Sequence, residues 1–167
     1  MISKLKNIRL AAFIVVAVFW TEKSALAQKA TVVKFDALQE ILNSKTDGIQ
    51  VINFWATWCA PCIKELPLLE KVNARSDLNA KITLINLDYA DKVDKVNDFI
   101  VRKNIRSRVL LLDEVDYNAW IDKVDKNWTG AIPATLIFDP QTGKRKFVEK
   151  ELKEGELEAL IVSLKKS

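Results

Sequence analysis

Cys59 and Cys62, the only two cysteines of the chain, lie three positions apart in the sequence CAPC. Residues with this spacing on one helical turn lie close enough for their sulfurs to bond. Such a pair can be a structural disulfide, part of a metal site or a reversible redox centre. The other residues of the chain discriminate among these uses.

A structural clip and a zinc site both fit poorly. A disulfide between neighbours this close removes little entropy from the unfolded chain, so it adds little stability. Zinc sites use about four ligands, mostly nitrogen and sulfur, whereas this chain has two cysteines and no histidine. Only a site completed by carboxylates or by a second molecule would remain. The missing histidine also excludes a Cys–His nucleophile and a serine nucleophile with a histidine base. We expect no metal and no cofactor.

A redox pair fits better. We expect a helix to begin near Cys59, with Pro61 tolerated in its first turn. Unpaired N–H groups and the positive end of the helix dipole favour a thiolate at this position. Cys59 would attack the disulfide of a partner, and the more shielded Cys62 would resolve the mixed disulfide. Glu65 is a candidate acceptor for the Cys62 proton, although its position alone fits an exposed helix glutamate equally well.

The apolar patterns around this pair predict an α/β fold. The order of elements indicates a central mixed sheet with helices on both faces. Asp36 and Gln39 look like a capping box that starts the first helix, and acidic residues from 88 to 98 look like a solvated helix start and face. The predicted strands are residues 31–34, 49–54, 82–87, 109–112, 134–138 and 144–149, and the predicted helices are 36–43, 59–75, 93–103, 117–124 and 154–164.

The N-terminus has the layout of a secretory signal peptide. Basic residues precede an apolar run at residues 10–20, and the small-x-small sequence Ala25-Leu26-Ala27 follows. As a helix this run would measure roughly 16 Å, and a bilayer core is about 30 Å thick. We therefore expect cleavage after residue 27, no stable membrane span and a periplasmic or otherwise extracytoplasmic protein. An uncleaved anchor is the alternative.

Length and charge limit the remaining classes. The chain has 167 residues and a net charge of +4. Removing residues 1–27 takes away four basic and one acidic residue, which leaves 22 basic and 21 acidic residues. Residues 28–167 are thus expected to form one domain without the basic stripe that nucleic-acid binding needs.

Two stretches resemble the thioredoxin superfamily. FWATWCAPC at residues 54–62 carries its cysteine motif, and Ile132-Pro133 before a strand resembles its cis-proline loop. CIKELP at residues 62–67 is most similar to the exported TlpA/ResA-like branch, as is the extra βα segment at 109–124. The resemblance implies a thioredoxin-like fold with a βα insertion before the cis-proline loop.

The resemblance also assigns expected roles. Cys59 would be the attacking sulfur and Cys62 the resolving one. Glu65 matches a buried acid that assists proton transfer in the branch. Many thioredoxins carry an aspartate where this chain has Asn53, which strengthens the case for Glu65.

Substrate binding is expected at the surface around the cysteines. Pro133 would form a cis peptide beside the pair, and Ile132 would offer its backbone to the substrate chain. Trp58, Ala60 and Pro61 complete this predicted surface.

The resulting hypothesis is an exported thiol-disulfide oxidoreductase that reduces protein disulfides. Members of the branch typically receive electrons from a membrane-embedded thiol donor, and some reduce apocytochrome cysteines during cytochrome c maturation. A disulfide oxidase or isomerase, a thioredoxin-like binding module without a major redox role, and a peroxidase are alternatives. Reduction potential decides the direction, and Ala60-Pro61 between the sulfurs leaves it open.

Overall fold

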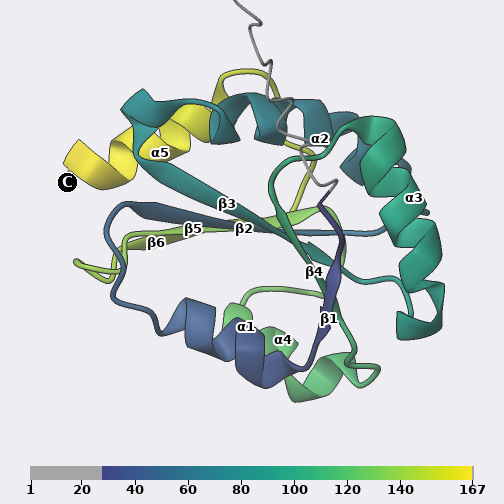
Figure 1. Ribbon diagram of the computed structural model, residues 1–167. Helices are drawn as coiled ribbons and strands as arrows, with labels where there is room; N and C mark the ends of the chain where they lie inside the picture. Colours follow the sequence, from purple (N-terminus) through teal and green to yellow (C-terminus); the bar gives the residue numbers. More distant parts are fainter. Residues whose placement is uncertain (1–27, 167) are drawn as a thin grey trace, which may run out of the picture.

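The computed structural model describes residues 28–166; the predicted signal peptide, residues 1–27, lies outside the described residues. A six-stranded sheet forms the centre, with helices packed on it (Figure 1). The elements in chain order are β1 (Thr31–Val33), α1 (Phe35–Leu42), β2 (Ile49–Trp55), α2 (Ala60–Asn73), η1 (Ser76–Leu78), β3 (Ala80–Asn86), η2 (Ala90–Lys92), α3 (Val93–Lys103), β4 (Arg108–Leu112), η3 (Tyr117–Ala119), α4 (Ile121–Val124), β5 (Ala134–Phe138), β6 (Arg145–Val148) and α5 (Glu156–Lys166).

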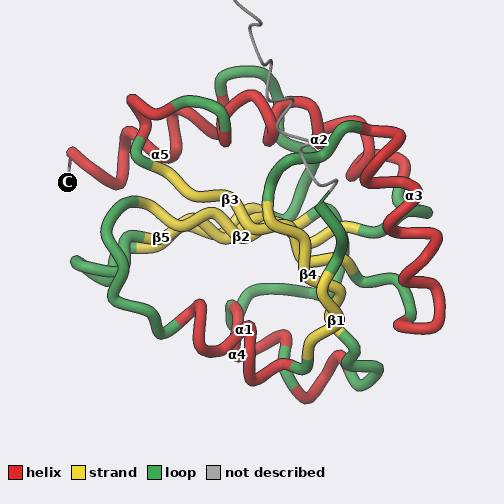
Figure 2. The backbone as a smooth tube through the Cα atoms, viewed as in Figure 1, coloured by secondary structure: helices red, strands yellow, loops and turns green. Residues whose placement is uncertain are grey.

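The sheet is mixed, as predicted. Its strand order is β1-β4-β3-β2-β5-β6, and the strands run through the middle of the molecule (Figure 2). β2 pairs in parallel with β3 and antiparallel with β5. Every residue of β2 is buried, because both faces of this central strand are covered.

Helices cover both faces of the sheet, which confirms the predicted layers. α2, α3 and α5 lie on one face, and α1 and α4 lie on the other (Figure 1). Side chains alternate along β2: Val51 and Trp55 belong to the core under α2, whereas Ile52 and Phe54 belong to the core above α1. The same alternation turns Asn53 toward α2.

The predicted insertion is present but its helix is shorter than expected. β4 lies between β1 and β3 in the sheet. The predicted continuous helix over 117–124 is wrong, because Trp120 has a φ of −138° and separates η3 from α4. The indole of Trp120 is buried against Phe54 and Trp128, and this packing fixes the break.

The predicted capping box is also wrong. Lys34 occupies the N-cap position of α1 and its side chain makes no capping bond, so Asp36 lies in the first turn. Phe35 is buried beside Trp120, and α1 begins at this residue, one position earlier in the chain than predicted. The backbone N–H of Phe35 instead donates to Oε1 of Glu114 at 3.1 Å.

Between residues 28 and 166, none of the helices combines the length and the apolar character that crossing a bilayer requires.

Candidate active site

Cys59 is the N-cap residue of α2, as the helix start predicted from the sequence requires. Its backbone is extended, and its Sγ accepts a hydrogen bond from the backbone N–H of Cys62 at 3.3 Å. Pro61 occupies the first turn, where its missing N–H removes no hydrogen bond from the helix. The sulfur thus lies at the positive end of a 14-residue helix, where negative charge is stabilised.

Cys59 and Cys62 form a disulfide with an S–S distance of 2.01 Å. Cys59 is 5% exposed to solvent, and Cys62 is fully buried. Cys59 is therefore the member of the pair that solvent reaches, while Cys62 is enclosed one turn into the helix. Ala60 and Pro61, between them, are exposed.

The loop before β5 lies against this disulfide. The Ile132–Pro133 peptide bond is cis, as predicted. The carbonyl oxygen of Ile132 is 3.7 Å from Sγ of Cys59. The structure thus brings together the cysteine pair and the loop some 70 residues later that the sequence predicted to complete the site.

Two further groups hold this loop, and neither was predicted from the sequence. The indole Nε1 of Trp128 donates to the carbonyl of Ala131 at 2.9 Å. The carboxylate of Glu149, just beyond β6, accepts from the backbone N–H and hydroxyl of Thr129 and from the N–H of Ala131. No local pattern marks Glu149, because its partners lie 18 and 20 residues earlier.

The segment before Cys59 is held by Asp88, which corrects the prediction of a solvated acidic face at this position. Asp88 is buried. Its carboxylate accepts from the backbone N–H of Thr57 at 2.8 Å, from the Thr57 hydroxyl at 2.7 Å and from Nδ2 of Asn86 at 2.8 Å. The turn between β2 and Cys59 is therefore fixed from the end of β3.

Glu65 is buried, which settles the choice between a buried acid and an exposed helix glutamate. It lies one turn after Cys62 and is 2% exposed. Its Oε1 accepts from Nδ2 of Asn53 at 2.8 Å, and its Oε2 accepts from the backbone N–H of Leu152 at 2.7 Å. Burial raises the pKa of Glu65 above its usual value, and these two hydrogen bonds only partly oppose the rise.

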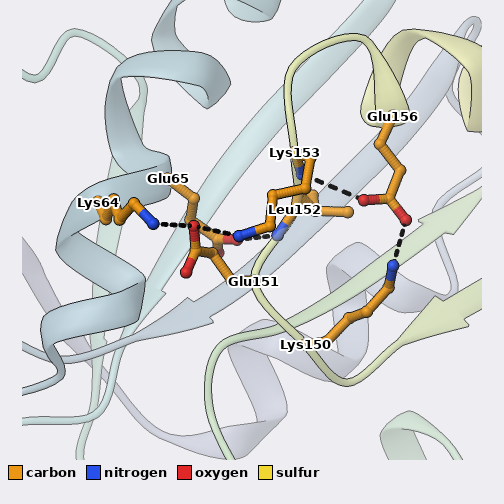
Figure 3. Close-up of polar contacts among 7 residues, drawn as sticks. All are labelled: Lys64, Glu65, Lys150, Glu151, Leu152, Lys153 and Glu156. Carbon is orange, nitrogen blue, oxygen red and sulfur yellow. Dashed lines mark hydrogen bonds and ion pairs between the residues drawn. The ribbon is translucent and has the colours of Figure 1, made fainter.

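A short segment after β6 covers Glu65 and is tied down by charged side chains (Figure 3). Leu152 is buried. Glu151 pairs with Lys64 and Lys153, and Glu156 pairs with Lys150. These pairs lie at the surface, so they position the segment more than they stabilise the fold.

A groove of about 400 Å³ adjoins Cys59 through two of its lining residues: Trp58, which directly precedes Cys59, and Ile132, whose carbonyl faces Sγ of Cys59. Trp58, 65% exposed, forms one wall, and the loop before Pro133 forms another. Most of the lining is apolar or small: Trp58, Leu87, Tyr117, Asn118, Ile121, Thr129, Gly130 and Ile132. An apolar groove next to a disulfide could receive apolar side chains of another polypeptide.

Across residues 28–166, His, Cys, Asp and Glu side chains form no group of three or more that could hold a metal ion.

The sequence matches the AhpC/TSA family over residues 19–144, which include both cysteines and the Ile132–Pro133 bond. The chain belongs to the AhpC/TSA family. This membership confirms the predicted relation to thioredoxin-like proteins.

Two curated relatives of this AhpC/TSA family chain are themselves named for thiol chemistry. It is 29% identical over 127 residues to a thiol:disulfide interchange protein DsbE of Pasteurella multocida, covering 71% of this chain and 64% of the relative. It is 38% identical over 89 residues to the thioredoxin-like protein YneN of Bacillus subtilis, covering 53% of this chain and 49% of the relative. The chain thus spans about half of one relative and less than two thirds of the other.

Solved structures confirm the thioredoxin-like fold. A thioredoxin-related protein from Neisseria meningitidis serogroup B superposes with a TM-score of 0.62 at 24% identity, covering 73% of this chain and 88% of that one. A DsbF homologue from Corynebacterium diphtheriae superposes with a TM-score of 0.56 at 25% identity, covering 72% and 74%.

Proposed function

We propose that this chain is an exported thiol-disulfide oxidoreductase that reduces protein disulfides through Cys59 and Cys62. One observation carries the proposal: a bonded Cys-x-x-Cys pair at the start of α2 lies 3.7 Å from the backbone of the loop that holds the cis proline. The curated relative DsbE, a thiol:disulfide interchange protein, supports the same class of reaction.

The reaction begins from the reduced pair. The Cys59 thiolate attacks one sulfur of a substrate disulfide, the substrate S–S bond breaks, and the second substrate sulfur leaves as a thiolate that takes up a proton. Cys62 then loses its proton and attacks Sγ of Cys59. The mixed disulfide breaks, the substrate leaves fully reduced, and two electrons have passed from the protein, which ends in the disulfide form described above.

Glu65 is assigned the role of accepting the proton that Cys62 loses. It lies on the same face of α2, one turn further along, and both residues are buried away from water. A carboxylate whose pKa is raised by burial is a stronger base than an exposed one, and it can take a proton that solvent cannot reach. Asn53 and Leu152 orient its two oxygens.

Trp58, Ile132 and Pro133 are assigned to the binding of the substrate polypeptide. The backbone of Ile132 faces Sγ of Cys59, so a substrate strand that pairs with it would bring its own sulfur to Cys59. The exposed ring of Trp58 and the groove beside it would receive apolar neighbours of that sulfur. Ala60 and Pro61 form the remaining exposed edge.

Catalytic turnover needs a second partner. Each cycle leaves the Cys59–Cys62 pair oxidised, so a thiol donor must return two electrons to it. The resemblance to the TlpA/ResA-like branch favours a membrane-embedded donor and export by cleavage after residue 27. Mass spectrometry of the protein recovered from cells tests the cleavage, and a protein that retains residues 1–27 would contradict it.

A trapping experiment tests the proposed function. The Cys62→Ser variant cannot resolve the mixed disulfide, so it should accumulate partner proteins bonded to Cys59. The Cys59→Ser, Cys62→Ser double variant is the matched control and should capture none. An absence of adducts with the single variant would overturn the proposal and favour a binding module.

Reduction potential separates the remaining enzymatic alternatives. A potential near that of reducing thioredoxins, about −270 mV, supports a reductant, whereas one near that of strong oxidants, about −120 mV, supports a disulfide oxidase. A peroxidase would consume hydrogen peroxide with thiol reductant, and a protein disulfide reductase would reduce insulin instead.

A further inference from the structure

Glu149 binds the loop that precedes Pro133 at three points. Its Oε1 accepts from the backbone N–H of Thr129 at 3.1 Å, from the Thr129 hydroxyl, and from the N–H of Ala131 at 3.0 Å. Gly130, between these two residues, has a φ of +91°, which glycine adopts without strain. The turn at Gly130 thus points two backbone N–H groups at one carboxylate, as in an anion-binding nest.

The residues that Glu149 binds lead directly to the reactive sulfur. Thr129, Gly130 and Ile132 line the groove beside Cys59. The Ile132 carbonyl follows Ala131 and lies 3.7 Å from Sγ of Cys59. A shift of the Thr129–Ala131 turn would therefore move both a wall of the groove and the backbone that faces the sulfur.

The backbone before Glu149 is held by strand pairing. Glu149 directly follows β6, whose last residue, Val148, pairs with Thr135 in β5. The turn is anchored on its other side by Trp128, which packs against Phe54 and Trp120. Glu149 accordingly connects the ordered edge of the sheet to a short loop that has few other polar contacts.

We infer that Glu149 is a positioning residue for substrate binding: it holds the Thr129–Ala131 turn so that Ile132 and the groove present one fixed surface to a polypeptide beside Cys59. The inference rests on the proposed function. Glu149 touches neither sulfur and is assigned no proton transfer. Its donors lie at the surface, where water can replace a lost carboxylate, so its removal should change the shape of the loop more than the stability of the fold.

The test compares two disulfide substrates of different size. Insulin requires a polypeptide surface, whereas Ellman's reagent is a small disulfide that can reach Cys59 without filling the groove. The Glu149→Ala variant should raise KM for insulin roughly tenfold, since misplacement of a binding surface by about 1 Å is costly. Its kcat for insulin and its rate with Ellman's reagent should stay within about twofold of those of the unmodified protein.

Glu154→Ala is the matched control. Glu154 is an exposed carboxylate five residues later that pairs with Lys71 and does not contact the loop. It should leave both reactions unchanged. Equal KM values for insulin in Glu149→Ala and Glu154→Ala would overturn the inference, as would equal losses with insulin and Ellman's reagent, because those would indicate a general structural defect.

A second pair of variants applies if Glu149→Ala fails to fold. Glu149→Gln keeps the reach and an acceptor oxygen, so its KM for insulin should stay within about threefold of the original. Glu149→Asp keeps the charge but is shorter by one methylene, so its KM should rise more. A larger rise in the KM for insulin in Glu149→Gln than in Glu149→Asp would overturn the inference. An unmodified protein that cannot reduce insulin would contradict the proposed function itself, which distinguishes the two failures.

Discussion

Nδ2 of Asn53 donates a hydrogen bond of 2.8 Å to Oε1 of Glu65 in a part of the core that excludes solvent. The same Nδ2 also donates to the Thr135 hydroxyl at 2.9 Å, and Oδ1 of Asn53 has no hydrogen-bond partner within residues 28–166. An amide carries both donors and an acceptor. Rotation of this amide would allow its oxygen to accept from a protonated Glu65, so Asn53 suits both charge states of the acid.

Replacement of the acid should slow resolution. Glu65→Gln cannot accept the Cys62 proton, so release of a mixed disulfide at neutral pH should slow by about tenfold or more. Because burial raises the pKa of Glu65, the rate for the unmodified protein should fall as the pH drops and Glu65 becomes protonated. Stopped-flow measurement of mixed-disulfide resolution across pH checks both effects. Glu154→Gln serves as the exposed control, and an unchanged rate in Glu65→Gln would remove the proton-transfer role.

Stability should depend on pH through the same residue. Burial raises the folded-state pKa of Glu65 above its ordinary value of 4.5, so the folded protein binds this proton more tightly than the unfolded chain. The resulting stabilisation is complete below the unfolded pKa and is lost as the pH rises through the folded one. Glu65→Gln should therefore lose less free energy of unfolding than the unmodified protein as the pH rises above 4.5. Urea unfolding at several pH values measures the difference, and the exposed variant Glu40→Gln should follow the unmodified protein.

An aspartate at residue 53 should destabilise the protein. Asn53→Asp removes the amide donor and places a second carboxylate beside Glu65, so one of the two must bind a proton or both charges must stay buried. We expect a loss of about 1–3 kcal/mol in the free energy of unfolding at neutral pH. Asn43→Asp, at an exposed position, should change it by less than about 0.5 kcal/mol. Equal effects at the two positions would contradict the described environment of Glu65.

Asp88 should stabilise the turn before Cys59. Asp88→Ala leaves the Thr57 N–H and hydroxyl without their acceptor, and a loss of about 1–3 kcal/mol is expected in the free energy of unfolding. Asp91→Ala removes an exposed carboxylate that pairs with Lys92 and should cost less than about 0.5 kcal/mol. Calorimetry measures the free energy of unfolding of both variants. Similar losses in Asp88→Ala and Asp91→Ala would show that the contacts of Asp88 with Thr57 do not stabilise the fold.

Local patterns were sufficient for the elements that carry the cysteines. The apolar run of β2 and the proline in the first turn of α2 are properties of consecutive residues, so the N-terminal position of Cys59 on its helix could be predicted. The cis bond at Pro133 came from resemblance to a family and not from composition. The buried state of Glu65 was left open by position alone, because its partners Asn53 and Leu152 lie 12 and 87 residues away.

The wrong predictions for Asp36 and Asp88 have the same physical origin. Asp36 has the spacing of a helix cap, but burial of Phe35 and the distant carboxylate of Glu114 decide where α1 begins. Asp88 looks like a solvated acid until β3 places it beside Thr57. Contacts between segments far apart in the chain override local preference in each case.

Residues 149–152 contact two separate parts of the site: Glu149 binds the turn at Thr129 and Ala131, and the backbone of Leu152 binds Glu65. The number of residues between these two contacts is therefore fixed by the geometry of the site. A one-residue insertion or deletion between Glu149 and Leu152 could preserve one contact while displacing the other. In relatives of this chain, we expect length variation to occur outside this stretch and side-chain variation to concentrate at its exposed middle position, Lys150.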